Sequence, residues 1–518
     1  MTTPRPPAPP FDRLKPPIVW LFEDQLSHDS SVLTSHPDSP VLLIESDRAF
    51  RRVRFHKKRL VFLVSAMRHF AAGLRSRGRV VHHYPLTPRG YKDSMDAIRD
   101  VVRATGSGTF VVMEPSEHHT REWLNSATGK LGVSLHFVPN TLFLTDRVEF
   151  GSWASSVKSP LMETFYRRQR RRYNVLMDSA GPAGGSWNLD KDNRKAFPRG
   201  LLVPPIPGFP PDAITREVMS EIDRRFADHP GSTDGFDLPV TRTDAQRLFN
   251  DFLKHRLPLF GDYEDAMVTG QPVLFHSLIS PLINAGLIGP LECVRAAERR
   301  YREGKAPLNS AEGFVRQILG WREYVYGIYW SFMPEYRARN VRGDSRPLPR
   351  LFWDGRTQMN CLRQCIGGVV DRAYSHHIQR LMVIGNFATL CGLSPQAVND
   401  WFYAMYVDSH DWVVTPNVIG MAMNADGGTM ATKPYISSAA YINRMSDYCS
   451  GCRYDPERRT GEGACPFNAL YWSFLHEQRE SLARNQRMAM MLKNLDRIPK
   501  AELEAMIRAK RAFLDLLD

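Results

Sequence analysis

Between residues 18 and 140 the chain alternates short apolar runs with segments of helical periodicity. An apolar run without polar alternation is typical of a strand that is buried on both faces. Strands of this kind separated by helices predict a doubly wound parallel sheet, and hence an α/β domain. The predicted strands are Ile18–Phe22, Val41–Glu45, Arg79–Tyr84, Phe110–Met113 and Ser134–Val138.

The clearest helical period covers residues 58–78, and Gly78 marks its end. Its apolar face comprises Leu60, Leu63, Val64, Met67, Phe70 and Leu74. Ligands of doubly wound sheets bind at the carboxyl ends of the strands. The region has no Gly-x-Gly-x-x-Gly motif, so a standard dinucleotide site is not supported.

Composition divides the chain of 518 residues into four parts. Residues 1–17 are rich in proline and predict a disordered leader that lacks the apolar core of a secretory signal. Residues 18–145 form the α/β domain, and residues 146–242 hold a basic helix and a linker rich in Gly and Pro. Residues 243–518 show helical patterns almost throughout, which predicts an all-α domain.

Four cysteines in the helical part suggest a metal centre. Cys449 and Cys452 form a Cys-x-x-Cys pair, and Cys465 follows and precedes a proline. Four thiolates suit zinc or an iron–sulfur cluster, and a proline directly after a cysteine favours the cluster. Spacing alone does not fix Cys361 as the fourth ligand, and unrelated buried thiols remain the alternative.

The net charge of +13 and the pI of about 9.4 favour a polyanionic partner such as nucleic acid, or else a basic solvated surface. Residues 163–173 carry five arginines within six positions, on a helix that either faces phosphates or is solvated. No apolar run is long enough to span a membrane. Seven cysteines, an odd number, favour a reducing cytoplasm over a disulfide framework. Nothing requires more than a monomer.

Three further segments carry polar groups suited to chemistry. Ser280-Pro281 opens a helix whose free N–H groups suit a phosphate, although most such starts are only caps. Trp321-Arg322-Glu323 is either a ligand-facing group or a structural ion pair. His376 and His377 are adjacent in an apolar helix and suit acid–base work near neutral pH, or else are core histidines. Arg380 lies where it can pair with a carboxylate such as Asp408.

Seven stretches together form a specific combination. They are Asp24-Gln-Leu-Ser27, Ser65-Ala-Met-Arg-His-Phe70, Gly320-Trp-Arg-Glu323, His376-His-Ile-Gln-Arg-Leu-Met382, Pro416-Asn-Val-Ile-Gly-Met421, Ile442-Asn-Arg-Met-Ser-Asp-Tyr-Cys449 and Cys465-Pro-Phe-Asn-Ala-Leu-Tyr-Trp472. The chain thereby resembles the photolyase/cryptochrome superfamily from about residue 18 to residue 515. Within it, the chain resembles the iron–sulfur bacterial branch of prokaryotic (6-4) photolyases and bacterial cryptochromes.

The resemblance implies an α/β antenna domain and a helical domain that holds a U-shaped FAD and a 4Fe-4S cluster, with Cys361 as the fourth cluster ligand. The phosphate-binding segment would contain His276, Ser277, Leu278 and Ser280. The residues that would line the flavin are Trp321, Arg322, Arg380, Asp408, Asp411 and Asn417. Trp401 and Trp353 match tryptophans that relay electrons to the photoexcited flavin.

The activity implied by the resemblance is blue-light repair of (6-4) pyrimidine–pyrimidone lesions in UV-damaged DNA by electron transfer from reduced FAD to the flipped-out lesion. His377 would give the lesion a proton, and His376 would hold the orientation of His377. Tyr435 and Tyr441 would line the lesion pocket. Asp190 and Asp265 would contact the water shell of a divalent cation such as Mg²⁺.

Three positions depart from patterns within the family. Leu381 replaces a second histidine that eukaryotic (6-4) photolyases have, so proton transfer depends on His377. Phe402 stands where close relatives can have tyrosine, which excludes a tyrosine relay there. Ala49 replaces an acidic residue that can contact a 6,7-dimethyl-8-ribityllumazine antenna, a role for which Glu45 is the nearby substitute.

Two other functions compete with repair. The chain could be a blue-light photoreceptor that signals through a partner, although its last helical pattern ends close to Asp518 without a long tail. It could also be an iron–sulfur DNA-binding module resembling the primase large subunit, which would hold no flavin.

Overall fold

The computed structural model describes residues 15–86 and 94–517, so residues 1–14 of the predicted leader lie outside the description. These residues form two compact units. One unit comprises the described residues up to Pro160 together with Pro207–Asn250 and Ile279–Cys293. The other comprises Leu161–Ile206, Asp251–Leu278 and the chain from Val294 onward. Within the described ranges, no helix has both the length and the apolarity needed to cross a bilayer.

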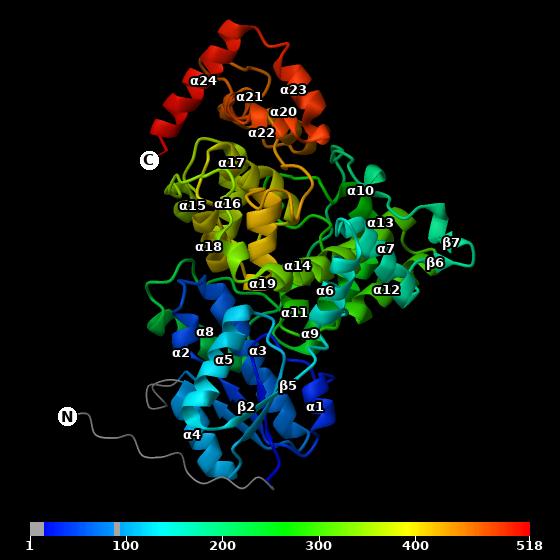
Figure 1. Cartoon of the computed structure of the whole chain (residues 1–518), viewed down its shortest axis with the longest axis vertical. Coiled ribbons are helices and arrows are strands. Elements are labelled where there is room, and N and C mark those ends of the chain that lie inside the picture. The colour runs from blue at the N-terminus through cyan, green and yellow to red at the C-terminus, as the bar shows by residue number, and fades with distance from the viewer. Residues whose placement is uncertain (1–14, 87–93, 518) are drawn as a thin grey trace, which may run out of the picture. The chain divides into compact units, whose positions relative to one another are not determined.

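A five-stranded parallel sheet forms the centre of the first unit, in the order β3-β2-β1-β4-β5 (Figure 1). The parallel sheet predicted from the sequence is therefore confirmed. Each strand forms within the predicted run or within one residue of it, because a continuous apolar run is stable only where both faces are covered. The strands are β1 (Ile18–Leu21), β2 (Val41–Ile44), β3 (Val81–Tyr84), β4 (Thr109–Met113) and β5 (Ser134–Val138).

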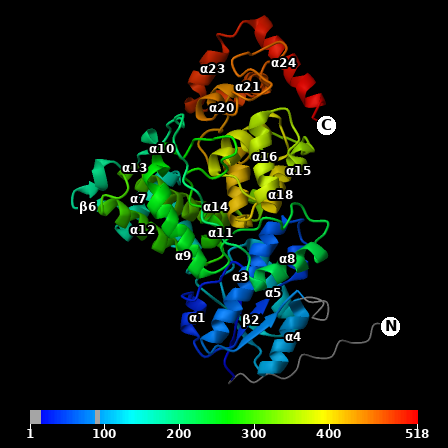
Figure 2. The same cartoon turned by 180° about the vertical axis from the view of Figure 1, so that it is seen from behind.

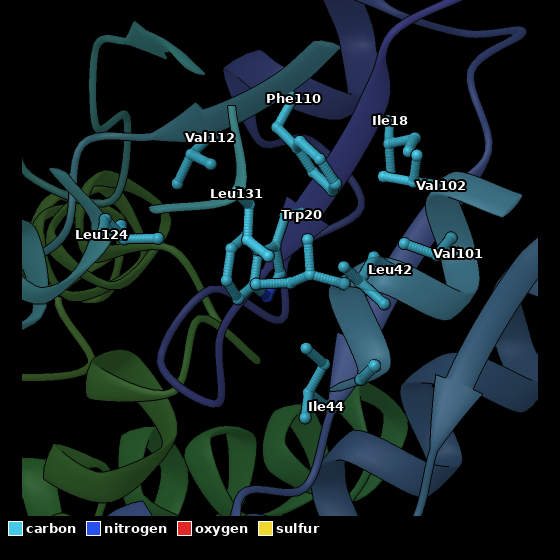
Figure 3. Close-up of a cluster of buried hydrophobic side chains, with 12 residues drawn as sticks. Ile18, Trp20, Leu42, Ile44, Val101, Val102, Phe110, Val112, Leu124 and Leu131 are labelled. Atoms are coloured by element: carbon cyan, nitrogen blue, oxygen red, sulfur yellow. The ribbon is translucent and has the colours of Figure 1, made fainter. Parts of the chain in front are cut away.

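One face of the sheet packs against α4 (Ser94–Thr105) and α5 (His118–Leu131). Trp20 lies at the middle of this core with 2% of its surface exposed, and its ring meets Phe110 edge-on at 5.9 Å (Figure 3). Side chains alternate across a strand, so the neighbours of Trp20 in β1 point to the opposite face.

The helix α3 (Lys57–Ser76) buries the predicted apolar face, and Gly78 has φ +81° just beyond its end. It packs against α8 (Ala213–Arg225). The prediction of a linker within residues 146–242 was therefore wrong for residues 213–225, which are helical. Asp212 caps α8 by accepting a hydrogen bond from the Thr215 N–H, and the prolines before it concealed this start.

The described residues from 243 onward are almost wholly helical, as predicted, and most of them belong to the second unit. In Figure 2 the helix α21 (Pro466–Glu477) lies beside α23 (Ala489–Leu495) and α24 (Lys500–Asp515), which it contacts. Four helical segments have π-helical hydrogen bonding: η3 (Phe252–Arg256), η4 (Arg316–Arg322), η6 (Gln379–Gly385) and η7 (Pro416–Ala422). Such segments are rare and occur frequently at functional sites.

The remaining elements of the two units are α1 (Ser31–Ser35), α2 (Asp47–Phe50), α6 (Arg147–Ser156), α7 (Met162–Tyr173), β6 (Met177–Asp178), β7 (Gly181–Pro182), η1 (Ala183–Gly185), η2 (Asp190–Asp192), α9 (Arg242–Asp251), α10 (Leu257–Tyr263), α11 (Ser280–Asn284), α12 (Pro290–Arg302), α13 (Leu308–Val315), α14 (Glu323–Phe332), η5 (Glu335–Ala338), α15 (Leu351–Asp354), α16 (Asn360–Arg372), α17 (Asn386–Leu390), α18 (Pro395–Met405), α19 (Asp411–Thr415), α20 (Ala439–Met445), α22 (Arg479–Ala483) and η8 (Gln486–Met488).

Two glycines of the first unit give a matched test of packing. Gly231 and Gly235 both have positive φ, +75° and +62°, so alanine at either position costs about 1–2 kcal/mol. A Cβ at Gly231 would also lie 2.1 Å from the Nε2 of the fully buried His56, whereas a Cβ at Gly235 would meet nothing within 4 Å. We expect Gly231→Ala to lower the free energy of unfolding by about 1–3 kcal/mol more than Gly235→Ala. Urea unfolding of both variants measures the difference, and equal losses would contradict it.

Candidate active site and cysteine cluster

The four predicted cysteine ligands line one pocket in the helical unit. Cys361 lies in the first turn of α16, Cys449 and Cys452 flank a tight turn, and Cys465 directly precedes α21. Pro466 begins α21 without needing a backbone N–H, and Cys465 lines the pocket directly before it. Ile442 and Phe467 are among the other lining residues.

All four thiols are free of disulfides. Burial raises the pKa of Cys449 to about 11 and that of Cys465 to about 12, and it raises the pKa of Cys361 further. After burial, the thiol of Cys365 contributes most to the effect at Cys361, and those of Cys465, Cys449 and Cys452 add to it. Four convergent sulfur donors in a largely apolar pocket fit a four-thiolate metal centre, whose binding would displace the thiol protons.

His276, His376 and His377 form a cluster of imidazoles. The rings of His276 and His376 are stacked, with centroids 4.4 Å apart and planes inclined by 15°. The Nε2 of His276 lies 3.2 Å from the Nδ1 of His377. His276 was predicted only as part of a phosphate-binding segment, and its contact with His377, 101 residues away in the chain, left no local signal in the sequence.

The expectation that both adjacent histidines lie in a helix was wrong, because the helix begins at His377 and His376 belongs to the irregular segment before it. His376 is 1% exposed, and neither of its ring nitrogens has a hydrogen-bond partner among the described residues. Burial lowers its pKa well below the usual value, so its ring is neutral. Ligand atoms of the three histidines lie within 4.8 Å of one another. Stacked rings direct their lone pairs along parallel planes, however, so the two stacked imidazoles do not converge on one ion.

The His376 segment is hydrogen-bonded toward the cysteine pocket. The backbone N–H of His376 donates to Gln379 Oε1 at 3.0 Å, and Gln379 Nε2 donates to the Tyr448 hydroxyl at 3.0 Å. Tyr448 lines the cysteine pocket, and Asn360 Nδ2 donates to its backbone carbonyl at 2.8 Å. Two hydrogen bonds therefore connect the histidine segment to a wall of the cysteine pocket.

Acidic and phenolic groups surround His377, whose side chain is 42% exposed. Its Nε2 lies 3.7 Å from Asp265 Oδ1, and the Tyr441 hydroxyl donates to the other Asp265 oxygen at 3.3 Å. Asp190 pairs with Arg194 and lies 3.2 Å from the Arg316 guanidinium. The structure thus brings Asp265 and Tyr441 together with His377, whereas Asp190 is engaged by two arginines.

Tyr435 belongs to the same neighbourhood as Asp190. Burial raises the pKa of Tyr435, and the charges of Asp190, Arg194 and Arg316 act on it. Its phenol is therefore a neutral group with a polar tip beside a charged cluster.

Arg380 and Asp408 form the ion pair expected from the sequence. The guanidinium donates to both carboxylate oxygens, at 3.1 and 3.0 Å, and its Nε donates to the Ser375 carbonyl at 2.7 Å. The guanidinium carbon lies 4.1 Å from the centre of the Tyr406 ring. This bidentate pair fixes Arg380 next to the histidine segment.

The other predicted flavin-lining residues divide into two groups. Trp321 and Arg322 lie in η4 and Asn417 lies in η7, so these π-helical segments, like η6 with Arg380, carry predicted contacts. Asp411 is 2% exposed and binds Tyr329, Arg337 and Thr415 at 2.7–2.8 Å. Its carboxylate is therefore a structural acceptor for three donors.

A buried arginine that the sequence did not reveal supports an anionic ligand in this unit. Arg256 in η3 is 0% exposed and lies 3.0 Å from Asp251, yet none of its three guanidinium nitrogens has a well-aligned acceptor among the described residues. Its charge acts on Tyr374, which also senses Arg380 and Asp408. A guanidinium buried without hydrogen-bond acceptors fits a site for phosphate groups.

The predicted phosphate segment is irregular from His276 to Ile279, and Leu278 has φ +61°, an uncommon conformation for a residue with a side chain. Such a conformation is frequently retained at ligand-binding backbone. Ser280 begins the short helix α11, which belongs to the other compact unit.

The two predicted relay tryptophans differ in exposure. Trp401 is 1% exposed and donates its indole N–H to the Phe352 carbonyl at 2.8 Å, whereas the next residue after Phe352, Trp353, is 47% exposed. The Phe352 ring lies 5.1 Å from the Trp401 ring. Trp401 and Trp353 are thus connected through Phe352, and one of them is buried while the other is exposed.

In the first unit, Glu45 is fully buried and already has several partners. Arg68 donates to both of its oxygens at 2.9 and 2.8 Å, and His83 and the Leu86 N–H each approach at 2.8 Å. Although burial alone would raise the pKa of Glu45, the hydrogen bonds from Arg68 and His83 lower it below the usual value. Its carboxylate is therefore a structural group at the carboxyl end of β2.

Only some of the arginines of the basic helix α7 are exposed to solvent. Arg170 is 0% exposed and donates to the carbonyls of Val175, Leu176 and Trp187. Arg171 lies over the Trp187 ring at 4.6 Å. At least one of the five arginines is therefore structural.

Comparison with known proteins agrees with these features. A profile of the family described as "Deoxyribodipyrimidine photo-lyase-related protein" matches residues 19–238. An uncharacterized protein of Acanthamoeba polyphaga mimivirus is 36% identical over 95 residues, 18% of this chain and 70% of that protein. The crystal structure of a bacterial class III photolyase from Agrobacterium tumefaciens has the same fold, with a TM-score of 0.58 at 16% identity over 97% of this chain and 98% of that chain.

The relationship is strongest to the (6-4) photolyase of Agrobacterium fabrum among these proteins. The two sequences are 44% identical over 507 residues, which cover 97% of this chain and 99% of the relative. Identity at this level over nearly the full length of both proteins shows common family membership. The chain therefore belongs to the photolyase/cryptochrome superfamily, in the branch of the bacterial (6-4) photolyases.

Proposed function

We propose that the protein repairs (6-4) pyrimidine–pyrimidone photoproducts in UV-damaged DNA in a light-dependent reaction. The observation that supports this best is the setting of His377, which has one ring nitrogen against His276 while its side chain is 42% exposed. An anchored imidazole that is open on one side is a suitable proton donor near neutral pH. The activity named for the Agrobacterium fabrum relative agrees with this chemistry.

FAD is the cofactor that this family implies, and the helical unit has groups suited to it. Arg256, Ser277 and Leu278 would hold the phosphates, and Trp321, Arg322, Arg380, Asp408 and Asn417 would line the ring system. The bound cofactor supplies light absorption and the electron for repair. Arg380 favours negative charge beside it through its positive guanidinium, whose position Asp408 fixes.

His377 would donate a proton to the flipped-out lesion so that the displaced oxygen returns to its original base. His376 and His276 limit the positions open to the His377 ring, because they pack on each other and on His377. Tyr435 and Tyr441 would line the lesion pocket. Flipping costs less at a damaged and poorly stacked base, which contributes to selectivity.

We further propose that Cys361, Cys449, Cys452 and Cys465 hold a 4Fe-4S cluster. Asp265, with Asp190 nearby, would contact the water shell of a Mg²⁺ ion. The α/β domain would serve as the antenna domain, but the engagement of Glu45 by Arg68 and His83 argues against Glu45 as a contact for a ribityllumazine. The net charge of +13 supports DNA as the partner.

The role of His377 predicts a selective loss of repair. In His377→Ala, blue-light repair of an oligonucleotide with one (6-4) lesion should fall by about 100-fold or more, with the flavin still bound, because a positioned proton donor is lost. The exposed His255 gives a control, since His255→Ala should repair normally. Repair by His377→Ala at the wild-type rate would exclude this role. A wild-type protein that holds reduced flavin but repairs nothing would favour the photoreceptor function.

The cysteine ligands predict a separate loss of iron. Cys449→Ala should yield protein that is insoluble or lacks iron, because three thiolates leave one corner of the cluster open. Cys391 is equally a buried free cysteine but does not line the pocket, so Cys391→Ala should keep its iron. Iron and sulfide analysis of both variants tests the assignment, and undiminished iron in Cys449→Ala would remove Cys449 from the ligand set.

The tryptophan path predicts a loss in light-driven reduction alone. Trp401→Phe should slow photoreduction of the bound flavin several-fold, because the buried step between the interior and Trp353 is removed. The half-buried Trp472 on α21 gives the control Trp472→Phe. Absorbance under blue light with an external reductant measures the rate. If chemically reduced Trp401→Phe also fails to repair DNA, the residue has a role other than relay.

A further inference from the structure

The ring of His276 is held by contacts to both of its nitrogens. Its Nδ1 lies 3.0 Å from the Val273 carbonyl oxygen, and its Nε2 lies 3.2 Å from His377 Nδ1. The ring is also stacked on His376, and the residue is 7% exposed. Its orientation is therefore fixed on three sides by described groups.

These contacts determine where the protons lie. A carbonyl oxygen only accepts, so the Nδ1 of His276 must carry a hydrogen and donate it to Val273. Burial, with a smaller contribution from the charge of His377, lowers the pKa of His276 to about 3 against the opposing effect of the Val273 and Glu264 carbonyls. The ring is therefore neutral and its Nε2 has no hydrogen. Without a hydrogen, the Nε2 of His276 can only accept a hydrogen bond. The hydrogen between this nitrogen and the Nδ1 of His377, which are 3.2 Å apart, therefore belongs to His377 Nδ1.

We propose that His276 is a positioning residue for the repair reaction: its Nε2 accepts the Nδ1–H of the His377 imidazolium, so that the hydrogen on the Nε2 of His377 is the proton given to the lesion and the neutral Nδ1–H ring remains. This inference rests on the proposed role of His377 as proton donor. The Nε2 of His377 is also the nitrogen that faces Asp265, at 3.7 Å. The proton thus leaves from the nitrogen on the side of Asp265 and Tyr441.

Asp265 favours the opposite tautomer of His377. A carboxylate beside Nε2 favours a hydrogen on that nitrogen, and in a neutral ring this would leave Nδ1 bare. The acceptor on His276 opposes this tautomer, because two bare nitrogens would then face each other at 3.2 Å. Without His276, we expect the neutral His377 ring to shift to the Nε2–H form. Its bare nitrogen is then Nδ1, so the ring gains and gives its additional proton at Nδ1, away from the lesion.

Two variants separate hydrogen bonding from packing. His276→Phe keeps an aromatic ring against His376 but removes the acceptor. His276→Gln lacks the ring but has an amide oxygen that can accept the Nδ1–H of His377. The flavin-bound protein is labelled with ¹⁵N-histidine, and the His377 signals are assigned by their loss in His377→Gln. The nitrogen shifts of the neutral ring report which nitrogen carries the hydrogen.

We expect the Nδ1–H form in the wild type, a shift toward the Nε2–H form in His276→Phe, and partial restoration in His276→Gln. Repair should fall by about 10- to 100-fold in His276→Phe, the range typical for the loss of a hydrogen-bonding group that orients a metal-ligating histidine. Rescue by His276→Gln is not expected from a purely structural role of the ring.

An Nε2–H tautomer in the wild type would overturn the proposal whatever the variants do. An unchanged tautomer in His276→Phe would overturn it as well. If His377→Gln repairs normally, the role of His377 in the proposed function fails, while the tautomer measurement still decides whether His276 orients that ring.

Discussion

The pair between Arg380 and Asp408 is the interaction on which the centre of the helical unit depends. Two charges with 26% and 8% of their side-chain surfaces exposed would each cost several kcal/mol to desolvate alone. The pair offsets this cost with two parallel hydrogen bonds, and the remaining Nε holds the Ser375 carbonyl. The same guanidinium that would face the cofactor therefore also fixes the backbone that leads into His376 and His377.

Sequence reasoning was strongest where the signal is local and continuous. The strands are runs of apolar residues, and α3 has an uninterrupted apolar face, so period and burial agree. The cysteines were recognisable because two of them stand in one short motif. Cys361 lies in a different element, α16, and its membership required the family pattern. The family resemblance, and not the spacing, therefore predicted the fourth ligand.

The features that sequence reasoning missed depend on contacts between distant residues. The helix α8 has few apolar residues and follows prolines, and it is stabilised by packing on α3 and by the contact of Glu221 with Arg68 at 2.6 Å. In the sequence, Arg256 cannot be distinguished from a solvent-exposed arginine, because only the fold shows that it is buried. His276 lies within a segment that predicted only a phosphate contact, whereas its ring meets His377 from 101 residues away. No local sequence periodicity predicts such contacts between distant residues.

The hydrogen bonds from His376 through Gln379 to Tyr448 have a consequence for how the protein would lose activity during storage in air. Tyr448 forms part of the wall around the four cysteines, so the loss of a group bound by them would leave the partner of Gln379 without its support on that side. Oxygen damage at the cysteines would then reach the histidines through two hydrogen bonds, independently of the cofactor. Molecules stored in air would lose repair while keeping their flavin colour, and colour alone would overstate the fraction of working enzyme.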